Sequence, residues 1–389
     1  MKYKPGRWVS VRIGHGSKLR FRMMLEPLLR YSHVVPPEGA PGADDTTDLI
    51  IRRGRLGLDL DGDHGLGLRF EMSVKNMHSE IHNMFGYWRP TPLLELQVGF
   101  IKAPGGLERD TFSFDQPFIE RSVITFFNRD HEVGAKLEGR SCDGTVRWAG
   151  AITRDPPPLP GGDPEDTPRI PTGIEEEDIA RPASKWASEG RLAYVPSPRL
   201  EASVNAGVRI RPDEPDFGEI AVEPYDTTFL TNRPYRGIMM RAGADVALSL
   251  AHWKLTAEAG VRRDGEQLAY PDGTAASEMS LGGHLHAEAA SVVLGYTPGG
   301  TYASAWKAAP LRTGWELVAR AMGMRVDPVD AGPALYSSIE LGWHWEATRQ
   351  LRVQIDAAFE HFGRNDVTLL NENRGADRIY AQTWAVFRL

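Results

Sequence analysis

Two short sets of histidine and glutamate residues are the first candidates for chemistry in this sequence. His78, Glu80 and His82 stand two residues apart, and a second set has the same spacing: His284, His286 and Glu288. Such residues share one face of a strand, where two imidazoles can ligate a metal ion and a carboxylate can complete the ligand set. Nothing in the sequence brings the two sets together. Solvated His and Glu are also common where a sheet closes around a water-filled interior. We therefore expect a polar lumen wall, with no metal and no other cofactor.

Other familiar constellations are missing from the sequence. No glycine-rich phosphate loop lies between a strand and a helix, and no nucleophile elbow is present, so we expect neither a nucleotide-binding protein nor an enzyme. The 45 basic and 52 acidic residues give a net charge of −7, which supplies no global basic field for nucleic acid. The lone cysteine, Cys142, cannot form an intrachain disulfide.

The elements that position these side chains follow from the hydropathy pattern. A mean hydropathy of −0.36 is typical of a soluble protein, and no stretch approaches the roughly 20 apolar residues of a membrane-spanning helix. Apolar and polar residues nevertheless alternate along most of the chain. Residues 200–210 read LEASVNAGVRI, and the same alternation recurs at 66–74, 94–100, 238–250, 338–346 and 351–360. Each run therefore has one apolar and one polar face when it forms a strand.

The length of these runs separates a membrane barrel from a soluble sheet. Each is about 9–13 residues long, enough for a tilted strand to cross a bilayer, whereas strands of soluble sandwiches are nearer 5–6. The segments begin near residues 18, 48, 64, 79, 93, 130, 144, 186, 199, 236, 252, 277, 313, 335, 350 and 378. The sequence thus predicts an all-β fold, a transmembrane antiparallel up-and-down β-barrel of about 16 strands over residues 18–389. Residues 1–17 are expected to form an N-terminal periplasmic segment.

Connections between the segments alternate between long and short, as in such barrels. The long ones are 34–47, 102–129, 155–185, 212–235, 263–276 and 364–377. With the N-terminus in the periplasm all of these lie outside, and 155–185 becomes a long extracellular loop. Two connections depart from the pattern, because 297–312 is long where a turn is expected and 76–78 is short where a loop is expected.

The chain ends and the aromatic residues bear on location. The first residues, MKYKPGR, lack the apolar core of a signal peptide, so we expect either that an export signal was removed ahead of this numbering or that the start is misassigned. Aromatic residues near strand ends are expected to face outward as girdles at the two membrane interfaces. They are Phe85, Tyr87, Trp148, Tyr194, Trp315, Trp343 and Trp345.

Several stretches form an ordered set across both halves of the chain. Residues 48–58 read DLIIRRGRLGL, 98–109 read VGFIKAPGGLER and 118–122 read FIERS, and 129–135, 314–320 and 335–363 follow. This set resembles the phosphate-selective porin O and P family. The resemblance implies a sixteen-stranded barrel in the bacterial outer membrane, generally a trimer, which passes small anionic solutes and is surrounded by outer-membrane lipid.

The resemblance also implies where solutes are handled. Residues 102–128 become an infolded constriction loop, with Lys102, Arg109 and Arg121 as its candidate basic residues. Arg53, Arg55 and Arg69 stand on adjacent inner walls. Cations in a narrow pore offset the hydration that an anion loses on entry, and guanidinium groups suit phosphate oxygens.

Departures from the family leave a second reading open. The same loop carries acidic residues that could neutralise its cations, namely Glu108, Asp110, Asp115 and Glu120. The 155–185 loop is rich in proline and holds the acidic run 175–178, and the chain ends in Leu389 where such barrels usually end in Phe. The alternative is a structural or partner-binding outer-membrane barrel, whose occluded pore conducts nothing and which anchors other envelope proteins.

Overall fold

The computed structural model describes most of the chain. The described residues are 9–13, 17–35, 44–75, 78–111, 116–118, 121–127, 131–154, 186–210, 216–222, 227–269, 280–298, 314–327, 333–348, 351–362 and 377–388. Within these ranges, no helix combines the length and the apolar character needed to cross a membrane.

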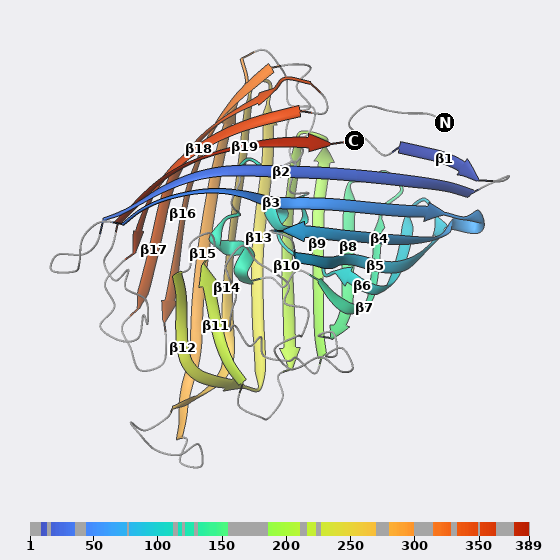
Figure 1. Ribbon diagram of the computed structural model, residues 1–389. Helices are drawn as coiled ribbons and strands as arrows, with labels where there is room; N and C mark the ends of the chain where they lie inside the picture. The colour runs from blue at the N-terminus through green and yellow to red at the C-terminus, as the bar shows by residue number, and fades with distance from the viewer. Residues whose placement is uncertain are drawn as a thin grey trace.

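Sixteen antiparallel strands form a closed ring, because the last strand pairs with the first of the ring. The strands are β2 (Ser17–Val35), β3 (Asp44–Asp61), β4 (Leu66–Lys75), β5 (His78–Thr91), β6 (Leu94–Lys102), β7 (His131–Arg140), β8 (Val146–Arg154), β9 (Trp186–Ser197), β10 (Leu200–Ile210), β13 (Ile238–Leu250), β14 (Trp253–Ala269), β15 (Ser280–Tyr296), β16 (Gly314–Asp327), β17 (Ala334–Glu346), β18 (Leu351–Phe362) and β19 (Asp377–Arg388). Each begins within four residues of its predicted start. The predicted barrel fold is confirmed. In Figure 1, β2 and β3 run across the view while β9 to β15 run steeply, as tilted strands on two sides of a barrel do.

Three strands lie outside this ring. β1 (Val9–Ile13) pairs with the same edge of β2 as β19 does. β19 ends with Arg388 opposite Met24, and β1 begins just beyond it with Val9 opposite Phe21. β11 (Asp216–Val222) and β12 (Thr227–Arg236) form a hairpin. This hairpin lies within the long connection predicted at 212–235, and β12 pairs with β14 beyond the start of β13.

The ring is apolar outside and charged inside. Along β17, Ile339 and Leu341 are each 62% exposed, whereas Glu340 between them is 1% exposed. The same alternation holds around the ring, where buried charged side chains include Asp59 and Arg320. A soluble protein has the opposite distribution, with charges outside and an apolar centre. An outer surface of this kind is stable in lipid, and a charged interior is typical of a membrane channel.

The connection lengths divide the barrel into two ends. The turn end carries the connections at 92–93, 141–145, 198–199 and 251–252, and the loop end carries 36–43, 103–130 and 155–185. Both predicted departures are real features, because β15 ends at Tyr296 and β16 begins at Gly314 at the turn end, while β4 ends at Lys75 and β5 begins at His78 at the loop end.

The predicted aromatic girdle is only partly correct. Trp148, Tyr194, Trp315 and Trp345 are exposed on the outer surface, and Trp343 is half-buried there. Phe85 and Tyr87 instead face inward and are 5% and 4% exposed. A β-bulge explains the error: Glu71 pairs with Asn83 and Met72 with Ile81, so the extra residue in β5 reverses which residues face inward beyond it.

Candidate functional site: the charged interior of the barrel

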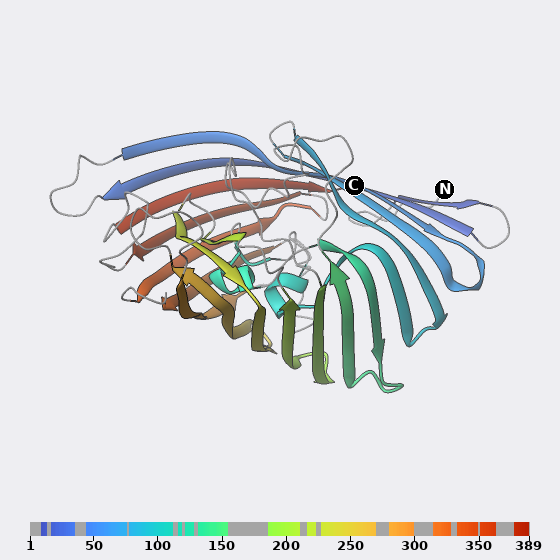
Figure 2. The same ribbon diagram turned by 90° about the horizontal axis from the view of Figure 1, so that it is seen from below.

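The segment between β6 and β7 folds into the ring rather than away from it. We call residues 103–130 the inner segment; its described parts contain the helical turns α1 (Leu107–Asp110) and η3 (Val123–Phe127). Figure 2 shows both turns enclosed by the strands. They rest against the inner faces of the strands from β13 to β18.

An apolar contact fixes one part of the inner segment. Val123, Ile124 and Phe127 are at most 4% exposed and pack on an apolar patch of the wall made by Ala287, Ala289, Met322, Met324, Val326 and Tyr336. Where η3 contacts β15 and β16, the inner faces of these strands carry small or apolar side chains in place of charged ones. The sequence VITFF in an otherwise polar segment therefore has a structural cause.

A buried ion-pair network fixes the other part. Arg320 on β16 donates two hydrogen bonds to the Glu340 carboxylate, at 2.8 and 2.6 Å, and a third to Glu108 of the inner segment at 3.2 Å. The Glu108 carboxylate also accepts from the backbone N–H of Ser122 at 2.8 Å, which closes the segment on itself. Glu258 on β14 accepts from the Glu108 backbone N–H at 3.0 Å.

Wall residues also neutralise two acids of the inner segment, whereas Asp115 and Glu120 lie outside the described residues. Glu108 pairs with Arg320, and Asp110 pairs with Arg191 of β9 at 3.0 Å. The sequence suggested that these carboxylates could cancel the segment's own cations. In the structure, Glu108 and Asp110 instead contact arginines of the barrel wall.

The structure brings three of the predicted basic residues together. Arg53 and Arg121, with Arg22 of β2, lie close enough to Arg55 to act on its guanidinium electrostatically. We call these four residues the arginine cluster. Arg53 faces inward by ordinary alternation with Arg55, and a bulge at the next position, where Glu26 pairs with Arg53 and Pro27 with Ile51, adds the buried Arg52 to the inner face.

Carboxylates contact part of this cluster. Arg55 donates to Glu71 at 3.4 Å, Arg22 forms an ion pair with the same carboxylate, and Arg53 lies 3.6 Å from Glu26. Both carboxylates are buried. The arrangement holds several cations side by side, which is a suitable environment for an anion that has given up part of its water.

Of the other three predicted basic residues, Arg69 lies beside the cluster, close enough to Arg22 to act on its guanidinium electrostatically. Arg69 forms a bidentate pair with Asp59, at 2.7 and 3.1 Å, and its guanidinium lies 5.5 Å from the Phe85 ring centre. Lys102 is half-buried at the end of β6. Arg109 lies in α1, and its side chain falls outside the described residues.

The two His and Glu sets differ in their placement. His284, His286 and Glu288 are exposed on the outer surface, because the inward positions of β15 are taken by Ala287 and Ala289. The expectation that this set lines the lumen was wrong. In the first set, His82 stacks on His131 with ring centres 4.0 Å apart, whereas the side chains of His78 and Glu80 fall outside the described residues. Across the described part of the chain, no three His, Cys, Asp or Glu residues gather as a metal site.

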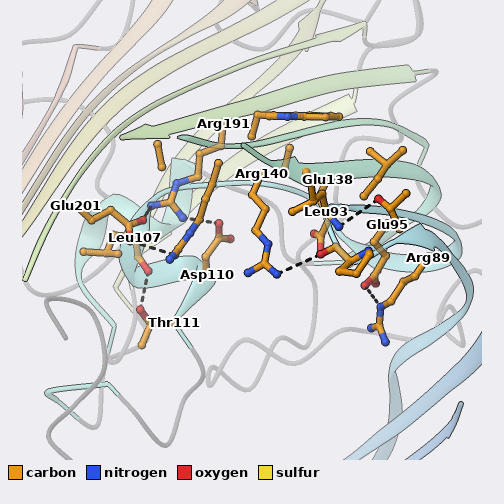
Figure 3. A pocket seen from close by; sticks show the side chains of 18 residues that line it. Arg89, Leu93, Glu95, Leu107, Asp110, Thr111, Glu138, Arg140, Arg191 and Glu201 are labelled. Carbon is orange, nitrogen blue, oxygen red and sulfur yellow. Dashed lines mark hydrogen bonds and ion pairs between the residues drawn. The ribbon is translucent and has the colours of Figure 1, made fainter. Parts of the chain in front are cut away.

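A cavity of about 540 Å³ opens at the turn end between the inner segment and strands β5 to β10. We call it the chamber (Figure 3). Its charged lining includes Arg89, Arg140, Arg147 and Arg191 together with Glu138 and Glu201. Sequence reasoning did not single these residues out. They occupy polar positions of alternating strands, but only the fold shows that they surround one space.

The turn between β7 and β8 holds Arg140 and Arg147 at the chamber. Its centre is Asp143, whose carboxylate accepts hydrogen bonds from the Ser141 hydroxyl at 2.5 Å and from the Thr145 backbone N–H at 3.1 Å. These hydrogen bonds hold the pKa of Asp143 below its usual value. The turn is therefore fixed by a carboxylate that stays ionised at neutral pH.

Comparison with solved structures gives the same architecture. The chain matches OmpT, an outer membrane protein of Vibrio cholerae, with a TM-score of 0.59 and 11% identity over 97% of this chain and 99% of that one. It matches an anion-selective porin from Comamonas acidovorans with a TM-score of 0.58 and 13% identity, over 96% and 100% of the two chains. It matches the outer membrane channel DcaP of Acinetobacter baumannii with a TM-score of 0.56 and 10% identity, over 97% and 99%.

These likenesses cover the chain from end to end and establish the fold of an outer-membrane porin. No protein-family model matches the sequence, and a sequence comparison with curated proteins gives no match. The resemblance to the phosphate-selective porin O and P family accordingly stays a prediction.

Proposed function

We propose that this chain is a porin of the bacterial outer membrane, through which small anionic solutes, phosphate among them, diffuse passively. The observation that carries the proposal is a closed barrel with an apolar exterior and an arginine cluster in its interior, made by Arg22, Arg53 and Arg55 of the wall and Arg121 of the inner segment. Cations spaced along a passage compensate an anion for lost water without holding it in one deep site.

The inner segment supports this proposal as the element that narrows the passage. It is held to the wall by Arg320 and by the apolar contacts of η3, so the narrowing is fixed in place. Arg121 of this segment lies close enough to Arg55 of the wall to act on it electrostatically, so the segment brings a further cation to the wall. The similar OmpT structure described as a trimer form supports a homotrimer as the assembled state.

Single-channel recording in planar bilayers tests the proposal. Folded protein should give discrete conductance steps in KCl, and a salt gradient should give a reversal potential that favours chloride. Folded protein without steps would remove the channel, and a reversal potential that favours potassium would remove the anion preference while leaving the channel.

Arg121→Gln tests the arginine cluster. The substitution removes one of the cluster's charges from the inner segment, and we expect the chloride-over-potassium permeability ratio to fall about fivefold, which corresponds to roughly 1 kcal/mol. Reversal potentials measured in a KCl gradient check this. Arg325→Gln is the matched control, since Arg325 is exposed on the outer surface beside Asp327. If the two variants have the same chloride-over-potassium permeability ratio, the arginine cluster is not the source of the anion preference.

An occluded barrel that anchors other envelope proteins is a second candidate. It is favoured by the inner faces of β16 to β19, where the large side chains Arg320, Arg352, Tyr380 and Trp384 are at most 1% exposed. On this account the protein co-purifies with a stoichiometric partner and gives no conductance in the same recordings.

A further inference from the structure

The chamber at the turn end holds charges that the arginine cluster does not explain. Arg140 at the end of β7 and Arg147 at the start of β8 are directly opposite each other in the strand register. Both line the chamber. Two like charges directly across an antiparallel pair repel, and this pairing destabilises a sheet unless something lies between them.

The carboxylates that line the chamber are already paired with other cations. Asp110 and Glu201 contact Arg191 at 3.0 and 3.1 Å, and Glu138 contacts Lys136 at 3.0 Å. A further lining carboxylate, Glu95, is bonded to Arg89. Glu201 contacts Arg147 as well as Arg191, and none of these carboxylates contacts Arg140 among the described residues.

Arg140 itself contacts no carboxylate within the described residues. Its guanidinium donates one hydrogen bond, to the Pro92 carbonyl at 3.3 Å, and the side chain is exposed. Arg147 lies 3.6 Å from Glu201, which Arg191 also holds, and its side chain is 41% exposed. Figure 3 shows Arg140 extending into the open space between Asp110 on one side and Glu95 on the other.

We propose that Arg140 and Arg147 form a second anion-binding site, which holds a small oxyanion such as phosphate at the turn end of the passage. The inference rests on the proposed function, because the anion reaches the chamber through the barrel. Two guanidinium forks on adjacent strands offer directed donors to separate oxygens of one phosphate. The bound anion lies between the two like charges and relieves their repulsion. Because water also reaches the site, binding is weak enough for release.

Block of chloride current by inorganic phosphate tests this site. With phosphate on both sides of the bilayer, the double variant Arg140→Gln/Arg147→Gln should raise the half-blocking phosphate concentration about tenfold, less than the full value of two charge-assisted hydrogen bonds. Arg199→Gln is the matched control, since Arg199 is exposed in a turn at the same end and is not part of the chamber lining. An unchanged half-blocking concentration in the double variant would overturn the inference.

A second measurement separates this site from the proposed function. Phosphorus NMR of inorganic phosphate with the folded full-length protein in detergent reports binding without any need for conduction. Line broadening that is smaller in Arg140→Gln/Arg147→Gln than in wild-type protein, and that falls further when Arg121→Gln is added, supports the site even if wild-type protein proves non-conducting. Broadening in the double variant equal to that of wild-type protein overturns the site even if wild-type protein is an anion channel. Arg140→Lys/Arg147→Lys keeps the charge but loses the forked guanidinium donors. Its line broadening should lie between that of wild-type protein and that of Arg140→Gln/Arg147→Gln.

Discussion

Replacing Arg320 by methionine is expected to destabilise the folded barrel by about 3–5 kcal/mol, because it leaves the buried Glu340 carboxylate without its cation. The same change releases Glu108, so the inner segment loses its main polar contact with β16. We therefore expect a lower free energy of unfolding in urea and a single-channel conductance that is larger and noisier than that of wild-type protein.

The control for this prediction lies on the same strand. Arg325→Met removes an arginine from the outer surface, where its pair with Asp327 is exposed to solvent and contributes little to stability. Equal losses of stability in the two variants would show that the Arg320 network does not hold the structure. A destabilised Arg320→Met barrel with unchanged conductance would show that the inner segment is positioned by the apolar contacts of η3 alone.

Ala290→Arg is expected to cost about 2–4 kcal/mol of folding free energy in lipid vesicles, because it places a charge on the outer surface near the bilayer midplane. Ala290 is exposed and pairs with Ala259 and Gly323 on the neighbouring strands. It lies six residues from Tyr296, whose ring stacks near Trp253 at the turn end. At about 3.4 Å per residue and a tilt near 40°, that distance is about 16 Å along the membrane normal, near the middle of an apolar band about 25 Å tall.

The same substitution at Ala149 is the matched comparison. Ala149 lies in β8 and lines the chamber, so an arginine there remains in water and should change the folding free energy by less than about 1 kcal/mol. Urea titration of folding into vesicles measures both variants. If Ala149→Arg proves the costlier of the two, the assignment of lipid-facing and water-facing sides is reversed and the membrane barrel is wrong.

Periodicity alone was sufficient to predict the ring. Alternation depends only on which residues face lipid, and lipid tolerates few charges, so each of the sixteen strands could be found from its own residues. The errors arose where a strand's own residues do not show which of its faces lies inward. The bulge in β5 placed Phe85 and Tyr87 inside, and a short apolar stretch in β15 placed His284 and His286 outside. Both changes depend on pairing with a neighbouring strand, which one strand's sequence does not contain.

The interior was predictable only in part for a related reason. Arg53, Arg55 and Arg121 could be selected as basic residues near the inner segment, and the structure brings them together. Their partners could not be selected, since Glu108 contacts Arg320 from 212 positions away and Asp110 contacts Arg191 from 81 positions away. The chamber was missed because its lining comes from separate strands and the inner segment.

The edge of β2 that pairs with β19, and beyond it with β1, has a consequence for how the barrel assembles. Nearly every pairing in the ring joins strands that follow one another in the chain, and these hairpins can form as soon as both strands are available. The seam between β2 and β19 joins residues more than 340 positions apart and carries the largest entropic cost of closure. Until it forms, both strands present unpaired backbone groups that a bilayer cannot satisfy. A nascent chain that lacks β19 should therefore stay with the assembly machinery instead of inserting, and delivery of the final strand becomes the committing event in biogenesis.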